Sequence, residues 1–125
     1  MSERKPVVMF VDDDPDYREV VCTLLESNGY EVVAAASGEE GLALYKQRRP
    51  DLVIVDLMME EVDSGTSFVK ELRLLGNTAP IFMLSSVGDN LSLAADPLAL
   101  GFAGVFQKPI DSRSLLAVLK ARLGR

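Results

Sequence analysis

Three aspartates stand at the ends of two apolar runs, where they could act together on a cation and a phosphoryl group. Asp12 and Asp13 follow the first run, and Asp56 ends the run 52–55. If both runs are neighbouring parallel strands, their carboxyl ends meet at one sheet edge, so the carboxylates converge. Such a cluster repels itself unless a cation lies in it, and oxygen ligands of this kind suit Mg²⁺. The pattern favours a magnesium-assisted phosphoryl acceptor over a structural salt bridge.

Helix capping is the competing explanation for aspartates that follow strands. Asp14 stands directly before Pro15, an arrangement typical of an N-cap with proline at the first helical position. One cap needs one residue, so Asp12 and Asp13 are left for another role. No helix starts immediately after Asp56, and a carboxylate at such a place can attack phosphorus to form an acyl phosphate.

Two further side chains at strand ends fit this chemistry. Lys108 follows a late apolar run and would bring an ammonium group into the cluster, where it would pair with a carboxylate and later with a phosphoryl oxygen. Ser85 offers a hydroxyl that can donate a hydrogen bond to a new phosphoryl group. For the neighbouring Ser86, a bond to its own backbone is the default expectation.

Composition limits the class of protein. The chain has 125 residues, 48% of them hydrophobic and 26% charged, which predicts one globular domain spanning 1–125. The net charge of −6 disfavours nucleic-acid binding by this domain. Histidine is absent, which excludes histidine bases, histidine metal ligands and phosphohistidine.

Targeting features and cysteine chemistry point to the cytoplasm. The apolar runs are far shorter than the roughly 18 residues of a membrane span, and no secretory signal pattern opens the chain. The single cysteine, Cys22, excludes an internal disulfide and favours a reducing compartment. It is expected to be a small buried thiol on a helix flank.

Strand and helix patterns alternate along the whole chain. Apolar, β-rich runs predict strands over 6–11, 30–35, 52–56, 80–85 and 103–107. Helical spacing and end signals predict helices over 14–28, 37–49, 66–75 and 111–123. Ser37 with Glu40 forms a capping box, and Asp111 is the expected cap of the last helix. The segment 87–100 is poorer, because Asp96-Pro97 breaks any helix there.

This order predicts an α/β fold with a parallel sheet and helices on both faces, joined by right-handed crossovers. Ligands in such folds bind beyond the carboxyl ends of the strands, where all the polar residues singled out above are expected. The helices should bury their apolar positions against the sheet. These positions are Tyr17, Val20, Val21, Leu24, Leu25, Phe68, Val69, Leu72, Leu75, Leu115, Leu116, Val118, Leu119 and Leu123.

Four motifs together resemble the receiver domain of two-component response regulators, the CheY-like family, over essentially the whole chain. They are VDDDPD at 11–16, VIVDLMM at 53–59, PIFMLSS at 80–86 and QKPI at 107–110. The resemblance implies a flavodoxin-like five-stranded sheet of order 2-1-3-4-5, with Asp56 as phosphoacceptor. It also implies Mg²⁺ bound by Asp13, Asp56 and the backbone carbonyl of Met58, with Asp12 holding metal-bound water. Ser85 takes the family's switch position, and Lys108 takes that of its invariant lysine.

The chain departs from the family pattern in three places. Glu60 stands where proline is usual, and the following turn, Asp63-Ser64-Gly65, is one residue longer. Val105 occupies the position of the switch aromatic, while the adjacent Phe106 should face the other side of its strand. The region 86–101 departs from a regular fourth helix, so output or dimer geometry cannot be copied from the family.

The resemblance implies a phosphorylation switch that a histidine kinase or histidine phosphotransfer protein loads, and that acts on an output protein or through a homodimer. Kinase contact is expected on the first helix near Arg18 and Val21. Such a domain is a signalling switch rather than an enzyme, although it catalyses its own phosphorylation and dephosphorylation. Three alternatives stay open: a receiver excised from a longer regulator with a DNA-binding or enzymatic output, a degenerate receiver that only binds protein, and a magnesium-dependent aspartyl phosphatase.

Overall fold

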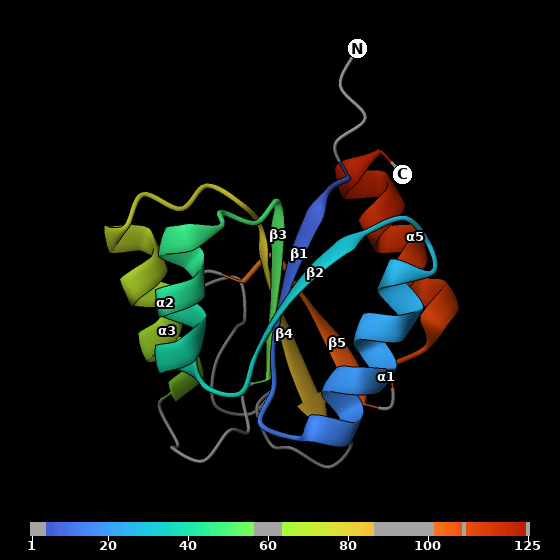
Figure 1. The fold of residues 1–125 in the computed structure, drawn as a ribbon, viewed down its shortest axis with the longest axis horizontal. Helices are drawn as coiled ribbons and strands as arrows, with labels where there is room; N and C mark the ends of the chain where they lie inside the picture. The colour runs from blue at the N-terminus through green and yellow to red at the C-terminus, as the bar shows by residue number, and fades with distance from the viewer. Residues whose placement is uncertain (1–4, 57–63, 87–101, 109, 125) are drawn as a thin grey trace.

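A parallel five-stranded sheet lies between two pairs of helices (Figure 1). The computed structural model describes residues 5–56, 64–86, 102–108 and 110–124. The strand order is β2-β1-β3-β4-β5, as predicted. The strands are β1 (Val7–Val11), β2 (Glu31–Ala35), β3 (Leu52–Asp56), β4 (Ile81–Ser86) and β5 (Gly104–Lys108). The helices are α1 (Pro15–Glu26), α2 (Gly38–Gln47), α3 (Ser64–Leu74) and α5 (Ser112–Leu123).

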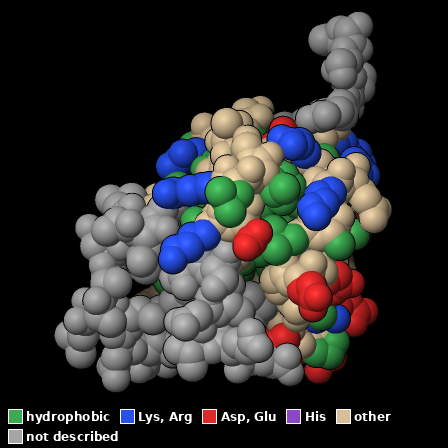
Figure 2. Space-filling view, turned by 90° about the vertical axis from the view of Figure 1, so that its left-hand side faces the viewer, with side chains coloured by type: hydrophobic (Ala, Val, Ile, Leu, Met, Phe, Trp, Pro, Cys, Tyr) green, Lys and Arg blue, Asp and Glu red, His purple; other side chains and the backbone are tan. Residues whose placement is uncertain are grey.

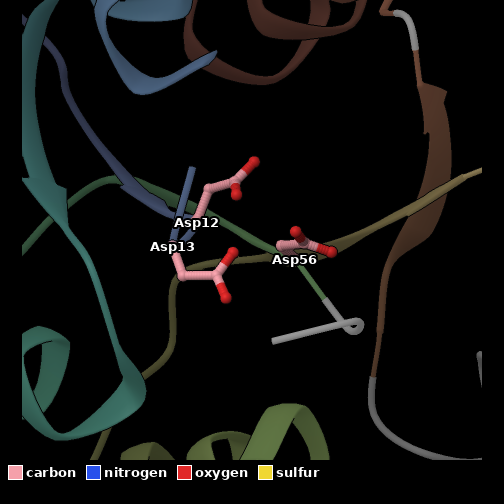
Figure 3. Close-up of side chains that lie close together, drawn as sticks. All are labelled: Asp12, Asp13 and Asp56. Atoms are coloured by element: carbon pink, nitrogen blue, oxygen red, sulfur yellow. The ribbon is translucent and has the colours of Figure 1, made fainter. Parts of the chain in front are cut away.

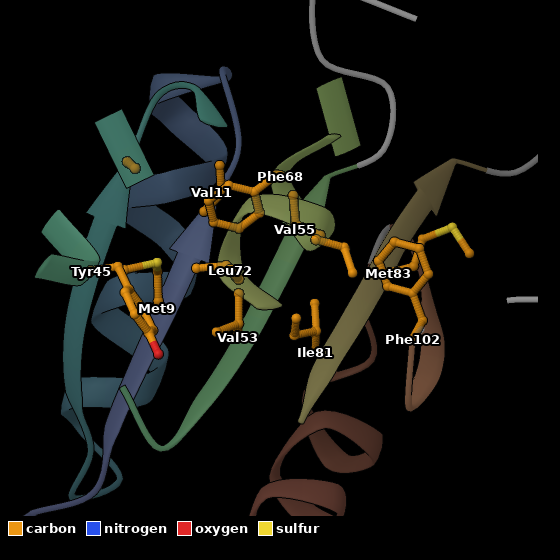
Figure 4. Packing of buried hydrophobic residues seen from close by; sticks show 12 residues of the cluster. Met9, Val11, Tyr45, Val53, Val55, Phe68, Leu72, Ile81, Met83 and Phe102 are labelled. Carbon is orange, nitrogen blue, oxygen red and sulfur yellow. The ribbon is translucent and has the colours of Figure 1, made fainter. Parts of the chain in front are cut away.

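Side-chain alternation along the strands divides the core into two clusters, one on each face of the sheet. Met9, Val53 and Met83 point toward the face that α2 and α3 cover (Figure 4). Phe10 and Ile54 point toward the opposite face, where they pack with residues of α1 and α5. Residues 7–11 of β1, 52–56 of β3 and 81–85 of β4 are buried because both faces of the sheet are covered, which explains the continuous apolar runs 7–11, 52–55 and 81–84.

Close packing of α2 on the core depends on one glycine. A Cβ atom placed on Gly41 would lie 3.0 Å from the ring of Phe68 and 3.3 Å from a methyl group of Val11. Both neighbours are buried, so neither has free space to move into. The absence of a side chain at Gly41 therefore lets α2 approach β1 and α3.

Capping begins α1 and α2 as the sequence predicts. The Asp14 carboxylate accepts hydrogen bonds from the backbone N–H groups of Asp16 and Tyr17, and Pro15 occupies the first turn. At α2, the Glu40 N–H donates to Ser37 Oγ at 3.1 Å. The Glu40 carboxylate in turn accepts from the N–H of Ala36 at 2.6 Å, one residue before the cap. Local side-chain bonds thus fix where the chain turns into both helices.

Asp14→Ala is expected to lower the free energy of unfolding by about 1 kcal/mol, because two N–H groups of α1 lose their acceptor. Urea unfolding followed by circular dichroism measures this difference. Asp111→Ala is the matched control, since Asp111 is also an exposed N-cap but makes no capping hydrogen bond. An equal loss in both variants would contradict the capping account.

Two expectations about the helices differ from the structure in detail, at Val20 and at Asp111. Val20 is 62% exposed, because the buried stripe of α1 runs through its neighbour Val21 instead. Val21 itself is only 3% exposed, and a kinase contact on α1 near Arg18 and Val21 stays a prediction. Asp111 stands at the N-cap of α5, but its carboxylate accepts from the Ser114 hydroxyl at 2.8 Å rather than from the helix backbone.

The boundaries of the other elements agree closely with prediction. Each predicted strand lies within about one residue of the observed one, and the four described helices lie within about two. Several predictions concern residues outside the described part of the chain. They are the helix break at 96–97 and the roles of Met58, Glu60 and Asp63. Among the residues that are described, no helix is long and apolar enough to cross a membrane.

Charged side chains of the described residues are unevenly distributed on the side of the molecule that α2 and α3 form. Figure 2 shows the side of α2 and α3, where Lys and Arg side chains gather in the upper part and Asp and Glu side chains lie mostly at the lower right. The lower end in Figure 1 is also where the carboxyl ends of the strands meet. The acidic side chains on this side are therefore concentrated toward that end of the molecule.

Cys22 lies half-buried on α1 and forms no disulfide, as expected. Burial raises the pKa of its thiol, and the nearby Glu26 adds to this shift. A raised pKa leaves less thiolate at neutral pH, which makes the residue a poor nucleophile. The expectation of a structural thiol agrees with this environment.

Candidate functional site

Parallel pairing brings the three predicted aspartates to one sheet edge. Val11 pairs with Val55, so Asp12 and Asp56 stand next to each other at the ends of β1 and β3. The Asp12 N–H donates to the carbonyl of Ala35 at 3.0 Å, which continues the β1–β2 ladder by one residue. Carboxylate oxygens of Asp12, Asp13 and Asp56 all lie within 4.8 Å of one another (Figure 3). We call these three residues the acidic cluster.

The members of the acidic cluster differ in how deeply they are buried. Asp12 is fully buried and Asp56 is 3% exposed, whereas Asp13 is exposed. Burial raises the pKa of Asp12, and the charge of Asp56 raises it further. A hydrogen bond from the Asp14 N–H at 3.0 Å and the contact with Lys108 act in the opposite direction. A buried carboxylate held in this way is costly, which is typical of functional sites.

Lys108 lies between the two buried carboxylates. Its Nζ donates a hydrogen bond to Asp56 Oδ2 at 3.1 Å and forms an ion pair with Asp12 Oδ2 at 3.0 Å. Asp12 Oδ2 is a buried oxygen whose contact with Lys108 is an ion pair rather than a well-formed hydrogen bond. Burial alone would lower the pKa of Lys108, but its contacts with Asp12 and Asp56 outweigh that effect and raise it. The ammonium therefore stays charged near neutral pH.

The donor set fits a hard divalent cation. Lys108 contacts two of the carboxylates of the acidic cluster, and the Arg18 guanidinium is bound to the Asp12 backbone carbonyl, so among the described residues three carboxylates still outnumber the cations beside them. Two members are buried, and Asp12 Oδ2 lacks a hydrogen bond. Mg²⁺ prefers oxygen ligands from one or two carboxylates and retains several waters. The exposed side of the cluster at Asp13 would admit such a hydrated ion.

Asp13→Asn is expected to raise the free energy of unfolding by about 1 kcal/mol in chelator-treated protein, because one charge leaves a cluster of like charges. The comparison is made by urea unfolding in EDTA. Glu19→Gln, an exposed substitution on α1, serves as control and should change stability by less than about 0.5 kcal/mol. A loss of stability in Asp13→Asn would show that the carboxylate makes attractive contacts that outweigh repulsion.

The remaining predicted residues lie as follows. Ser85 is 5% exposed in β4, one position beyond Leu84, which pairs with Asp56. Val105 is 42% exposed on β5, while Phe106 packs against Phe82 with ring centroids 5.3 Å apart. The prediction that Phe106 faces away from the switch position is therefore confirmed.

Two residues of α1, Arg18 and Tyr17, contact members of the site, although the sequence predicts other roles for them. Arg18 donates from Nη1 to the backbone carbonyl of Asp12 at 2.8 Å. The ring of Tyr17 lies 4.8 Å from the Nζ of Lys108. Both residues lie in the first turn after the Asp14 N-cap, which follows Asp12 and Asp13 directly. Their position next to the aspartates in the sequence is the feature that could have indicated a role in the site. The prediction that Tyr17 packs toward the core also holds, since its ring packs against the cluster that contains Phe10.

Comparisons with known proteins agree with this geometry. Residues 8–120 match the model of the response regulator receiver domain family. The chain is 38% identical over 123 residues to a protein of Guillardia theta named probable transcriptional regulator ycf27, covering 98% of this chain and 47% of that protein. It is 35% identical over 122 residues to the DNA-binding dual master transcriptional regulator RpaA of a Synechocystis species, covering 96% of this chain and 50% of the relative.

The chain thus spans about half the length of the curated relatives it matches. Among solved structures, chemotaxis protein CheY4 of Vibrio cholerae superposes with a TM-score of 0.84 at 34% identity. That alignment covers 96% of this chain and 100% of the solved one. Sequence and fold therefore point to the same family.

Proposed function

The chain belongs to the response regulator receiver family, and on this premise we propose that Asp56 accepts a phosphoryl group in a phosphorelay. The observation that carries the proposal is the acidic cluster with Lys108 bound to two of its members. A structural salt bridge would need one carboxylate for one ammonium, whereas Lys108 contacts two carboxylates here and an oxygen of a third, Asp13, lies within 4.8 Å of theirs. Phosphoryl transfer assisted by a bound cation would account for the additional carboxylates.

Asp56 is the best placed nucleophile of the three. It ends β3, where the backbone is held on both sides by β1 and β4. A carboxylate oxygen of Asp56 would attack phosphorus, and the bond from phosphorus to the leaving oxygen would break. The product is an acyl phosphate on Asp56 and a released donor group, such as acetate from acetyl phosphate. Water later hydrolyses the acyl phosphate and resets the site.

Asp12, Asp13 and Asp56 would hold Mg²⁺, with the backbone carbonyl of Met58 as a further ligand implied by the family. When bound, the ion would offset negative charge on the transferring group and the attacking carboxylate. Lys108 would stabilise the same charge through its contact with Asp56. Its ammonium already touches the Asp56 carboxylate, so a short movement would bring it to a phosphoryl oxygen.

Phosphorylation would also bias the surface near β4 and β5. A phosphoryl group adds a charge of about −2 beside Lys108 and Ser85. The Ser85 hydroxyl would turn toward it and donate a hydrogen bond. Because Val105 replaces the family's switch aromatic, the change would pass through the backbone of β4 and β5 rather than through a rotating ring. Such a change is a shift between existing conformations.

Partners follow from the family. A sensor histidine kinase or histidine phosphotransfer protein would donate the phosphoryl group, and an output protein or a second copy would read it. The domain would work in the cytoplasm as one signalling unit over residues 1–125, without turnover of external substrates. Relatives named as transcriptional regulators support an output in gene control.

Incubation with acetyl phosphate and Mg²⁺, followed by intact mass measurement, tests the proposal. We expect a mass gain of one phosphoryl group per chain that disappears when EDTA removes the metal. Hydroxylamine should reverse the gain, since it cleaves acyl phosphates but leaves phosphoserine intact. A gain that resists hydroxylamine, or that persists in EDTA, would contradict the proposal.

A further inference from the structure

We propose that Tyr17 is a positioning residue for Lys108, holding its ammonium group against Asp12 and Asp56. The inference rests on the proposed function and extends it to a residue that touches neither the acceptor nor the acidic cluster. Tyr17 lies in the first turn of α1. Lys108 is the last residue of β5, which is the edge strand opposite β2 in the sheet. Two separate contacts connect them.

The first contact is a hydrogen bond to the backbone beyond Lys108. The N–H of Ile110 donates to the Tyr17 hydroxyl at 2.8 Å, joining positions 93 residues apart. Ile110 stands only two residues after Lys108, in the connection between β5 and α5. A short, partly buried bond at this point fixes the chain that leaves Lys108 to the start of α1.

The second contact is made by the ring. The Nζ of Lys108 lies 4.8 Å from the centroid of the Tyr17 ring, within the range of a cation–π interaction. The ring is itself held, because it packs on Phe10 with centroids 6.2 Å apart. The Tyr17 backbone N–H also donates to Asp14 Oδ1 at 3.3 Å, which ties the residue to the helix cap.

Both contacts bear on the geometry that phosphoryl transfer needs. A lysine side chain has a flexible four-carbon stem, so its ammonium must be restrained from outside. Two carboxylates attract the group on one side, and the ring of Tyr17 faces it on another. When phosphorylation changes the charge at Asp56, the ring would keep the ammonium within reach of the new phosphoryl oxygen. Small displacements of a charged group reduce transfer rates strongly.

The test compares Tyr17→Phe and Tyr17→Leu with wild type. Tyr17→Phe keeps the ring but loses the bond to Ile110, and should slow phosphorylation by acetyl phosphate about threefold. Tyr17→Leu loses both contacts and should slow it about tenfold. Tyr45→Phe is the matched control, since it removes a buried tyrosine hydroxyl that donates to Asn77 Oδ1 at 3.3 Å, away from the acidic cluster. Its rate should equal that of wild type.

Nuclear magnetic resonance supplies a readout that does not depend on phosphorylation. The Lys108 ε-protons should show an upfield ring-current shift in wild type and Tyr17→Phe but not in Tyr17→Leu. The Ile110 amide should exchange faster with solvent in Tyr17→Phe than in wild type. These shifts, with the slower rates, would support the proposal even from Tyr17→Phe alone, should Tyr17→Leu fail to fold.

Wild-type rates in Tyr17→Phe, or an equal slowing in Tyr45→Phe, would overturn the proposal. So would a Lys108 ring-current shift that survives in Tyr17→Leu. If the wild-type chain takes up no phosphoryl group, the proposed function fails, while the resonance measurements still decide whether Tyr17 positions Lys108.

Discussion

Asp56→Asn is expected to abolish phosphoryl uptake from acetyl phosphate in the presence of Mg²⁺. The amide that replaces the carboxylate lacks the charged oxygen that would attack phosphorus, and it is a poorer ligand for a hard cation. Asp12 and Asp13 remain in this variant, so the experiment asks whether they can replace the lost nucleophile. The phosphorylated fraction is measured by intact mass after a fixed incubation.

Asp51→Asn is the matched control for this variant. Asp51 directly precedes the same strand, at its opposite end, where Oδ2 accepts a hydrogen bond from the Val7 N–H at 2.8 Å. Asparagine can accept the same bond through its remaining oxygen, so this variant should fold and take up phosphoryl groups as wild type does. Uptake at the wild-type level in Asp56→Asn would refute the assignment of the nucleophile.

Lys108→Ala is expected to lower the free energy of unfolding by about 2 kcal/mol in EDTA, because two buried carboxylates lose their ammonium partner. This loss of stability is smaller than that expected for a fully buried pair, since the Lys108 side chain is 21% exposed and water screens part of the charge. Adding Mg²⁺ should restore much of the loss. Urea unfolding with and without the ion measures both effects.

Acidification provides a second check on Lys108→Ala. The pKa of Asp12 is already raised by burial in the wild type, and loss of the ammonium should raise it further. In the unfolded chain the Asp12 carboxylate takes up a proton only at a lower pH than in the folded protein. The stability deficit is therefore full at neutral pH and shrinks as pH falls and the carboxylate takes up a proton.

Lys46→Ala, at an exposed position in the last turn of α2, controls for the loss of a lysine side chain and should cost much less. A deficit in Lys108→Ala that neither Mg²⁺ nor acid reduces would show that Lys108 stabilises the fold by packing rather than by charge.

The parts of the structure that could be predicted are those that depend on neighbouring residues or on a repeated pattern. Alternation of apolar runs with helical spacing was enough to predict the sheet and its layers. Strand ends placed Asp12, Asp56 and Lys108 together, because parallel strands end at one edge. Cap residues such as Asp14 and Ser37 act on amides within three positions, so their effect is visible in the sequence.

Choices between equivalent local arrangements could not be predicted. Val20 and Val21 are adjacent and chemically identical, and only the packing of α1 on the sheet decides that Val21 is buried. Asp111 has the same position relative to its helix as Asp14, yet a hydroxyl at Ser114 attracts its carboxylate. The contacts of Tyr17 join residues 93 positions apart, and no local pattern indicates them.

Reductive trapping tests the central claim most directly. Borohydride reduces an acyl phosphate on aspartate to homoserine, which peptide sequencing by mass spectrometry locates within the chain. Wild-type protein treated with acetyl phosphate and Mg²⁺ should yield homoserine at position 56 and at no other aspartate. Homoserine at position 12 or 13, or none in protein that has gained the phosphoryl mass, would contradict the account.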